Sequence, residues 1–302
     1  MGDKLKSKVQ YWYEEKYKVL MILPFLLVIL ALAQISVQYY TTGDFVHRGV
    51  TLKGGSTITI TKDVAMGEEG LETFLQSKFP TEDISVRTIT SAGRVVGLSV
   101  DSDVQEKAEI DSLIKVIKQQ TLITDKDYNA EVIGSSLGAN FFKQTIFALL
   151  VSFLLMGLVV ILYFRIIIPS LAVILCAFSD IVVTVAVFNL TGMKLSTAGV
   201  AALLMLIGYS VDTDVLLTTR SMRRQEGLLK DRIYSSIKTG LTMTFTTLVV
   251  ILIALFFVQS DVVKQIMYIL LIGLMVDMPM TWIQNVGVLR LYLEKKKYKY
   301  ND

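Results

Sequence analysis

Long apolar stretches with almost no charge recur along the chain, and shorter polar segments separate them. Each stretch is close to or above the ~18–20 residues that a helix needs to cross ~30 Å of hydrocarbon. The pattern therefore predicts six transmembrane helices. The predicted spans are residues 19–37, 145–164, 166–190, 195–219, 241–258 and 266–289.

Between the first two spans, residues 41–140 change from continuous apolar runs to regularly spaced apolar positions. Alternation at every second residue predicts strands, and spacing of three and four residues predicts helices. The pair Ala92-Gly93 between two alternating runs favours a hairpin turn. The resulting order, strand–helix–strand–strand–helix–strand, fits a ferredoxin-like α+β domain. The predicted strands are 56–61, 83–90, 94–100 and 128–133, and the predicted helices are 68–79 and 104–120.

These elements predict a polytopic α-helical membrane protein with one extracytoplasmic ferredoxin-like α+β domain between spans 1 and 2. Cations near the spans concentrate on the side of the N-terminus, whereas the two short loops on the other side hold only Lys194 and Lys264. Because cytoplasmic loops carry the excess of Lys and Arg, we expect a multi-pass protein of the cell membrane with both termini in the cytoplasm. The predicted segments are a cytoplasmic N-terminal segment (1–18), transmembrane helix 1 (19–40), the extracytoplasmic domain (41–140), a five-helix transmembrane bundle (141–292) and a basic cytoplasmic tail that meets lipid headgroups (293–302).

Composition narrows the chemistry. Hydrophobic residues make up 53% of the 302 residues, and the mean hydropathy is +0.55. One cysteine, Cys176, and one histidine, His47, exclude a disulfide scaffold and a Cys/His zinc site. A net charge of +3 gives no case for nucleic-acid binding. The chain has neither a phosphate-binding loop nor a nucleophile elbow, so we expect no enzyme activity, no metal and no cofactor. Energy would come from an ion gradient or from a partner.

Four aspartates, Asp180, Asp212, Asp214 and Asp277, lie inside the predicted spans. A charge at the centre of a membrane helix costs ~2.5–3.5 kcal/mol on insertion scales, so such groups face a bundle interior or water and mark ion or proton paths. Burial disfavours the ionised form of an aspartate, which lets it exchange protons near physiological pH. The four aspartates are therefore candidates for a proton relay.

Position along the helix ranks two of these acids. Residues two apart on a helix point ~200° apart, so Asp212 and Asp214 cannot face the same neighbour. Asp214 is closer to the expected cytoplasmic interface, whereas Asp212 is deeper, and Gly208 and Ser210 nearby would allow close helix approach. We therefore expect Asp212 to be the first relay residue, with Asp214 as the second candidate.

Some of the other relay candidates can also be explained by roles other than proton transfer. Asp180 is expected to be a member of the same network. Asp277 precedes Pro279 by two residues, and because proline frees a backbone carbonyl, Asp277 could belong to a kinked segment instead. Lys238 is a weaker relay candidate, since a lysine at this position is more often an anchor on the positive side of the membrane.

Several short segments resemble the SecD/SecF family of protein-export membrane proteins, which is part of the RND superfamily. Residues 49–56 are similar to the family's Gly-x-Asp-Phe-x-Gly-Gly-Thr segment, although Thr-Leu replaces Asp-Phe. Residues 163–165 resemble the turn between spans two and three. The strongest match is Ile-Gly-Tyr-Ser-Val-Asp-Thr-Asp-Val at 207–215. The motif residues of this chain are Gly54, Gly55, Arg165, Gly208, Tyr209, Ser210 and Arg220.

The resemblance is to the SecF subunits of that family. It implies a partner of the SecD type, a position beside the SecY channel, and assistance to a translocating polypeptide, driven by the proton motive force. In the usual register the fourth-span acid would fall on Thr213, but this chain has Asp212 and Asp214 on either side, a variant that favours an archaeal origin. Two other functions stay open: an RND-type exporter of small molecules or lipids, and a passive scaffold of the translocon.

Overall fold

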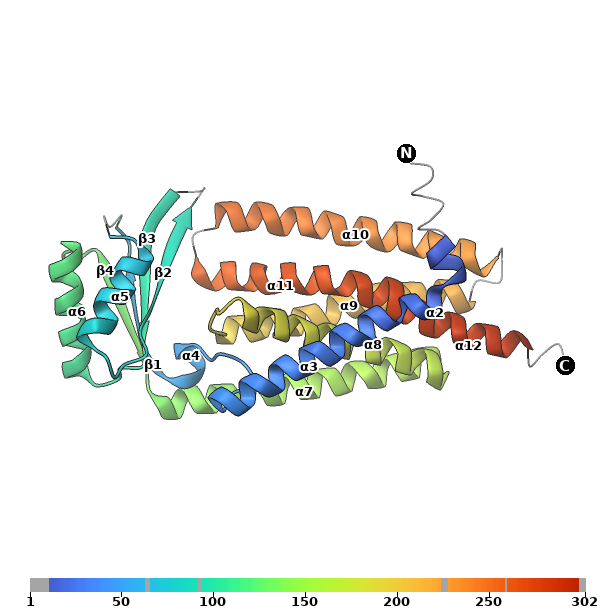
Figure 1. Ribbon diagram of the computed structural model, residues 1–302, viewed down its shortest axis with the longest axis horizontal. Coiled ribbons are helices and arrows are strands. Elements are labelled where there is room, and N and C mark those ends of the chain that lie inside the picture. The colour runs from blue at the N-terminus through green and yellow to red at the C-terminus, as the bar shows by residue number, and fades with distance from the viewer. Residues whose placement is uncertain (1–10, 63–65, 92–93, 224–227, 259, 299–302) are drawn as a thin grey trace.

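The structure is a computed structural model that describes residues 11–62, 66–91, 94–223, 228–258 and 260–298. It consists of a bundle of long helices with a small sheet domain at one end (Figure 1). The bundle is built from α2 (Tyr17–Leu20), α3 (Ile22–Thr42), α7 (Ser135–Phe164), α8 (Ile167–Leu190), α9 (Thr197–Arg223), α10 (Leu229–Phe257), α11 (Asp261–Pro279), the π-helical segment η1 (Met280–Asn285) and α12 (Val286–Tyr298).

Six helices of the described chain are long and apolar enough to cross a membrane, which confirms the predicted class of polytopic helical membrane protein. Their apolar residues follow from the sequence pattern, and their surroundings in the bundle differ. α7 and α10 leave many leucine, valine and phenylalanine side chains exposed, whereas α8 and α9 bury about half of their apolar window. Exposed apolar side chains are expected where a helix faces lipid.

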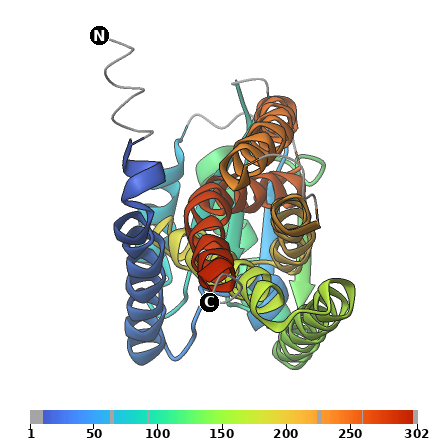
Figure 2. The same cartoon turned by 90° about the vertical axis from the view of Figure 1, so that its right-hand side faces the viewer.

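α9 contacts four other spans of the bundle, α7, α8, α10 and α11, and Figure 2 shows the bundle from the end opposite the sheet domain. Small residues allow the closest approaches. A Cβ on Gly273 of α11 would lie 2.5 Å from the methyl carbons of Leu206 on α9, so no larger residue fits there without a shift. Side chains of α9 therefore pack against several neighbouring spans.

The sheet domain has the predicted order of elements. β1 (Gly55–Ile60), α5 (Glu68–Lys78), β2 (Ser85–Ser91), β3 (Arg94–Ser102), α6 (Lys107–Thr121) and β4 (Tyr128–Ile133) follow one another along the chain. The strands form one antiparallel sheet in the order β2-β3-β1-β4, as in a ferredoxin-like domain. The predicted turn at Ala92-Gly93 lies outside the described residues. The domain's own core is formed by Ile58, Ile60, Leu71, Leu75, Leu98, Val100, Leu113 and Ile117, all almost fully buried.

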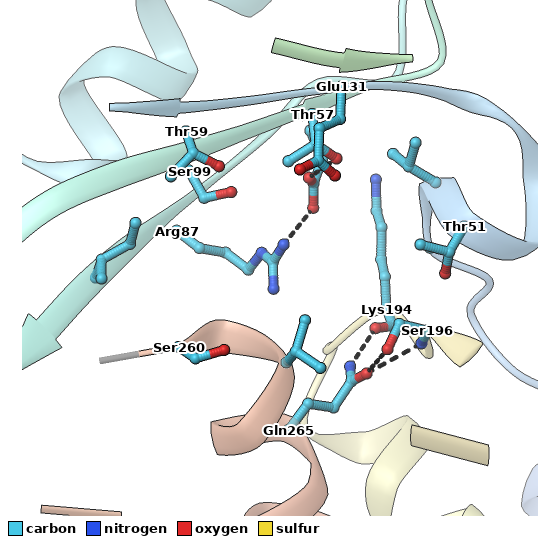
Figure 3. Close-up of a pocket in the computed structure, with 15 residues that line it drawn as sticks. Thr51, Thr57, Thr59, Arg87, Ser99, Glu131, Lys194, Ser196, Ser260 and Gln265 are labelled. Carbon is cyan, nitrogen blue, oxygen red and sulfur yellow. Dashed lines mark hydrogen bonds and ion pairs between the residues drawn. The ribbon is translucent and has the colours of Figure 1, made fainter. Parts of the chain in front are cut away.

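Strand alternation gives the sheet two different faces. Ile58 and Ile60 of β1 point to α5 and α6, so the intervening Thr57 and Thr59 point to the other face, toward the helical bundle (Figures 1 and 3). On β3, Asp101 lies on this same polar face. The domain therefore turns its apolar core away from the bundle and presents polar groups to it.

Glycines allow close contact between the sheet domain and the membrane helices. The short helix α4 (Val50–Lys53) leads into Gly54 and Gly55, whose φ values of 94° and 137° favour glycine. A Cβ on Gly54 would lie 2.5 Å from the Cα of Ser135 at the start of α7. The motif glycines thus let the backbone of the domain touch the backbone of the second span.

The last span, predicted as a helix over 266–289 with Pro279 as a source of a kink, is interrupted in the structure. α11 ends at Pro279, η1 follows as a π-helical turn, and α12 continues to Tyr298, into the segment expected as a tail. α2 and α12 both lie at the end of the bundle opposite the sheet domain (Figure 1).

Candidate functional site

Three of the four intramembrane aspartates meet inside the bundle. Asp180 comes from α8, Asp214 from α9 and Asp277 from α11, and none is more than 1% exposed. Each lies well inside its helix: Asp214, for example, is nine residues before the end of α9, or ~14 Å at 1.5 Å per residue. Three different helices therefore place carboxyl groups in one buried cluster, which we call the carboxyl cluster.

Hydroxyl and amide groups bind these carboxyl groups. Ser210 Oγ donates to Asp180 Oδ2 at 2.5 Å, and Asn285 Nδ2 donates to Asp214 Oδ1 at 2.7 Å. Thr281 Oγ1 lies 3.0 Å from Asp214 Oδ1 and 3.1 Å from Asp277 Oδ1. A hydroxyl has one proton to donate, so Thr281 can satisfy only one of these two acids at a time.

The cluster has more acceptors than donors. Asp180 Oδ1 and Asp214 Oδ2 are buried without a hydrogen-bond donor among the described residues. In the described part of the chain, no Lys or Arg forms an ion pair with any of the three acids. Protons are therefore the simplest way to complete this arrangement.

The same place contains the chain's one cysteine. Cys176 Sγ and one oxygen each of Asp180 and Asp214 lie within 4.8 Å of one another, and all three residues are buried. Such a donor set has the composition and spacing to hold a cation as well as protons.

Comparison with known proteins identifies the family. Residues 113–295 match the profile described as "Protein export membrane protein SecD/SecF, C-terminal". The chain is 36% identical to the protein-export membrane protein SecF of Pyrococcus furiosus over 98% of this chain and 97% of that protein. It is 35% identical to the SecF of Methanothermobacter thermautotrophicus over 93% of this chain and 94% of that protein. The chain belongs to the SecD/SecF family of protein-export membrane proteins.

A solved family structure has the same fold. The crystal structure of SecDF from Thermus thermophilus, described as a translocon-associated membrane protein, matches with a TM-score of 0.70 at 20% identity. The match covers 91% of this chain but only 38% of the SecDF chain, so this chain spans well under half of that protein. The family assignment predicted from the sequence motifs is thus confirmed, and with it a role in protein export.

The two relay candidates on α9, Asp212 and Asp214, lie in different surroundings. Asp212 is exposed on the outer face of α9 and lies outside the carboxyl cluster, whereas Asp214 is fully buried in it. The ~200° separation held, but the packing of α9 turned Asp214 inward. Ser210 also faces inward. Close helix approach at Gly208, expected from the sequence, is wrong for the described chain, because a Cβ there would meet nothing within 4 Å.

The remaining family motif residues and Lys238 lie apart from the cluster. Arg220 of α9 donates to Ser235 and Thr239 of α10 at 2.9 Å and so ties two spans together. Arg165, with a φ of 56°, ends α7 in the turn before α8. Tyr209 is 40% exposed and Lys238 is exposed on α10. These residues shape or border the bundle without touching the acids.

One functional element was missed by sequence reasoning, namely the π-helical segment η1. In this segment the N–H of Val286 bonds to the carbonyls of Ile283 and Thr281 and skips that of Trp282. The segment carries Thr281 and Asn285, the two side chains that bind Asp214. π-helical turns inside α-helices are rare, and those that occur often lie at functional sites. Pro279 was the sequence signal, but it indicated a kink and not which side chains would turn inward.

A polar cleft separates the sheet domain from the outer end of the bundle (Figure 3). Its volume is about 330 Å³. On the sheet side, Arg87 pairs with Asp101 at 2.6 Å. On the bundle side, Gln265 of α11 donates to the backbone carbonyl of Lys194 at 2.6 Å and accepts from Ser196 at the start of α9. Each wall therefore has polar groups that pair within that wall.

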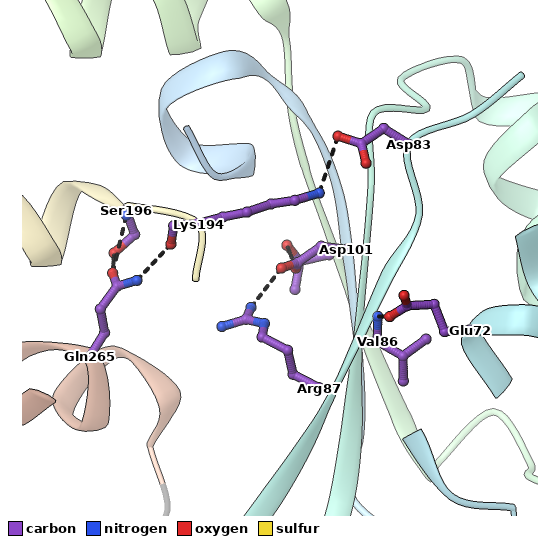
Figure 4. Close-up of polar contacts among 9 residues, drawn as sticks. Glu72, Asp83, Val86, Arg87, Asp101, Lys194, Ser196 and Gln265 are labelled. Atoms are coloured by element: carbon purple, nitrogen blue, oxygen red, sulfur yellow. Dashed lines mark hydrogen bonds and ion pairs between the residues drawn. The ribbon is translucent and has the colours of Figure 1, made fainter. Parts of the chain in front are cut away.

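Two lysines bridge this cleft. Lys194 Nζ, in the loop between α8 and α9, lies 3.1 Å from Asp83 Oδ2 of the sheet domain (Figure 4). Lys264 Nζ of α11 donates to the backbone carbonyl and to the hydroxyl of Thr90 on β2. Both contacts join the sheet domain to helices of the bundle.

Proposed function

We propose that this chain assists protein translocation as the SecF-type subunit of a complex with a SecD-type partner beside a SecY channel, and that protons passing through the carboxyl cluster drive it. The observation that carries the proposal is the meeting of Asp180, Asp214 and Asp277 without a cation among the described residues. Ionised carboxylates are costly there. Changing their protonation changes the energy of packing α8, α9 and α11 together, and the packing can respond.

The helices that carry the acids also hold the sheet domain. α9 begins at Thr197, 17 residues or ~26 Å from Asp214, and α11 begins close to Lys264. Gln265 ties the outer ends of the two helices together, and Lys194 and Lys264 reach the domain from there. A shift of α9 against α11 at the cluster would therefore reach the sheet domain, which would act on emerging polypeptide.

The orientation in the membrane is part of the proposal. Lys and Arg outnumber acids around the ends of α7–α8, α9–α10 and α12, which favours a cytoplasmic location for these ends and for both termini. The sheet domain then lies outside the cytoplasm, and the basic tail contacts lipid headgroups. The chain performs no covalent chemistry on its substrate in this proposal and uses no cofactor.

Two other functions make different predictions. A small-molecule or lipid exporter would work without a channel partner and would move solutes across vesicles. A passive scaffold would support export to the same degree with or without titratable groups in the cluster. Co-purification of the chain with proteins of the SecD and SecY type argues against the exporter, and acid-to-amide variants separate the machine from the scaffold.

The test uses cells whose single copy of the gene carries Asp214→Asn, Asp277→Asn or Asp212→Asn. The first two remove a titratable group from the cluster and keep its shape, while Asp212→Asn makes the same change on the outer face of α9. We expect accumulation of unexported precursor with the first two at normal protein level, and near-normal export with the third. Normal export in both cluster variants, or failure confined to Asp212→Asn, would overturn the proposed relay.

A further inference from the structure

The cytoplasmic end of the bundle contains a contact that reaches the carboxyl cluster from an unexpected direction. Tyr13, on the helical turn that precedes α2, donates from its hydroxyl to the backbone carbonyl of Trp282 at 2.7 Å. The two residues are 269 positions apart in the sequence. Trp282 lies in η1, between the two side chains that bind Asp214.

The carbonyl of Trp282 accepts a hydrogen bond from outside its own helix. In an α-helix, the N–H of Val286 would bond to this carbonyl four residues earlier. Here that N–H bonds to Ile283 and Thr281 instead, and the Trp282 oxygen loses its α-helical donor. The Tyr13 hydroxyl supplies a donor to this oxygen in place of the Val286 N–H.

The Tyr13 hydroxyl is held in place by the helix that follows η1. Arg290 of α12 donates to the backbone carbonyls of Tyr13 and Glu14 at 3.0 and 2.9 Å. Its guanidinium lies 4.1 Å from the centre of the Tyr17 ring. The turn before α2 is thus clamped to α12, which fixes the backbone that carries Tyr13.

Tyr13 keeps its proton across the physiological range. Burial raises the pKa of Tyr13 well above its ordinary value, the nearby Tyr234 adds to this effect, and Arg290 opposes it. The residue also lines a cleft of about 390 Å³ at this end of the bundle, next to Tyr234 and Glu294. The hydroxyl is therefore a permanent donor at the boundary between this cleft and η1.

We propose that Tyr13 is a positioning residue for the carboxyl cluster: its hydrogen bond to the Trp282 carbonyl holds η1 in the π register that turns Thr281 and Asn285 toward Asp214. If η1 changed to α-helical register, the residues after the change would rotate by ~100° per residue of shift. Asn285 would then leave Asp214. This inference rests on the proposed function for its purpose, but the structural coupling can be measured without any export assay.

Tyr13→Phe removes only the hydroxyl and is compared with Tyr11→Phe, the same change at a residue that is 54% exposed. The full-length protein is used in lipid nanodiscs. Cys176, buried 3.9 Å from Thr281 Oγ1 and the chain's one cysteine, serves as a native probe of the cluster. We expect N-ethylmaleimide to alkylate Cys176 about 2- to 12-fold faster in Tyr13→Phe, as the loss of one hydrogen bond of about 0.5–1.5 kcal/mol implies. Amide hydrogen exchange over residues 280–287 should rise by a similar factor.

An infrared spectrum separates positioning from general loosening. The vibrational band of the Asp214 carboxyl is assigned by its disappearance in Asp214→Asn. It should shift in Tyr13→Phe and in Asn285→Ala, and the double variant should shift no further than Asn285→Ala alone. An unchanged band, with alkylation and exchange as in wild type, overturns the proposal even if Asp214 is needed for export. A shifted band together with normal export in Asp214→Asn leaves the positioning role intact and refutes the proton-driven function.

Discussion

Gly240→Ala tests whether the packing behind the π-helical segment is as tight as the structure shows. Gly240 lies on α10, and a Cβ there would be 2.2 and 2.5 Å from two ring carbons of Trp282. Trp282 is only 6% exposed and is enclosed by Leu217, Ile233 and Val286. Overpacking of an enclosed core costs about 1–3 kcal/mol, and alanine returns about 0.8–1.0 kcal/mol of helix propensity. Because the indole ring is rigid, we expect an overpacking cost at the upper end of its range, so the free energy of unfolding should fall by ~2 kcal/mol.

Gly208→Ala is the matched control, since it is also a glycine inside a membrane helix. A Cβ at Gly208 would meet nothing within 4 Å, so alanine should be neutral or stabilising by about 0.4–1 kcal/mol. Both variants are unfolded by titration with sodium dodecyl sulfate in mixed micelles, with helical circular dichroism as the signal. Equal stability of Gly240→Ala and wild type would refute the reasoning, and so would a loss confined to Gly208→Ala.

Three further predictions concern the sheet domain. Lys194→Met together with Lys264→Met should speed amide exchange over residues 83–91. The free energy of global unfolding should change by less than about 1 kcal/mol, because exposed polar contacts such as these contribute little. Unchanged exchange would contradict the bridging role. Gly54→Ala should lower the yield of folded protein in a size-exclusion profile, because its Cβ would lie 2.5 Å from a backbone atom at a φ of 94°; a wild-type profile would contradict it. The backbone N–H and hydroxyl of Thr124 lower the pKa of Asp127. This carboxylate therefore stabilises the domain above its ordinary pKa, and the stability is lost as pH falls. The melting temperature of Asp127→Asn should depend less on pH between about 6 and 3 than that of wild type, and an unaltered dependence would contradict this account.

The elements were predictable because each has a strong local signal. Uncharged runs of ~20 residues define membrane helices by the cost of charge in hydrocarbon. In the sheet domain, alternation such as Ser56–Thr61 determines which side chains face the core, since the period of a strand is two. The structure has the same order of strands and helices. Local sequence decides these features, so sequence reasoning reaches them.

The choice between Asp212 and Asp214 needed information about packing. A helix of known length can still rotate about its axis, and the neighbours of α9 fix that rotation. A signal was present, because Ser210, Thr213, Asp214, Leu217 and Thr218 form one stripe at helical spacing and are all buried. The stripe predicts that Asp214, and not Asp212, is the buried acid of this helix.

The π-helical segment could not be predicted in the same way. Pro279 removes one backbone donor and so permits an irregular turn, but its register depends on distant groups such as Tyr13 and the Trp282 ring against Gly240. Such contacts join residues that are far apart in the chain. The grouping of Asp180, Asp214 and Asp277 has the same origin, since each comes from a different helix.

The most direct test of the central claim measures protein translocation into inverted membrane vesicles with and without an imposed pH gradient. Vesicles contain either the wild-type chain, Asp214→Asn or Asp212→Asn at equal amounts. The carboxyl cluster predicts that the gradient speeds translocation in wild-type and Asp212→Asn vesicles and has no effect with Asp214→Asn, in which the buried acid can no longer take up a proton. An equal response to the gradient in Asp214→Asn vesicles would contradict the proton-driven account.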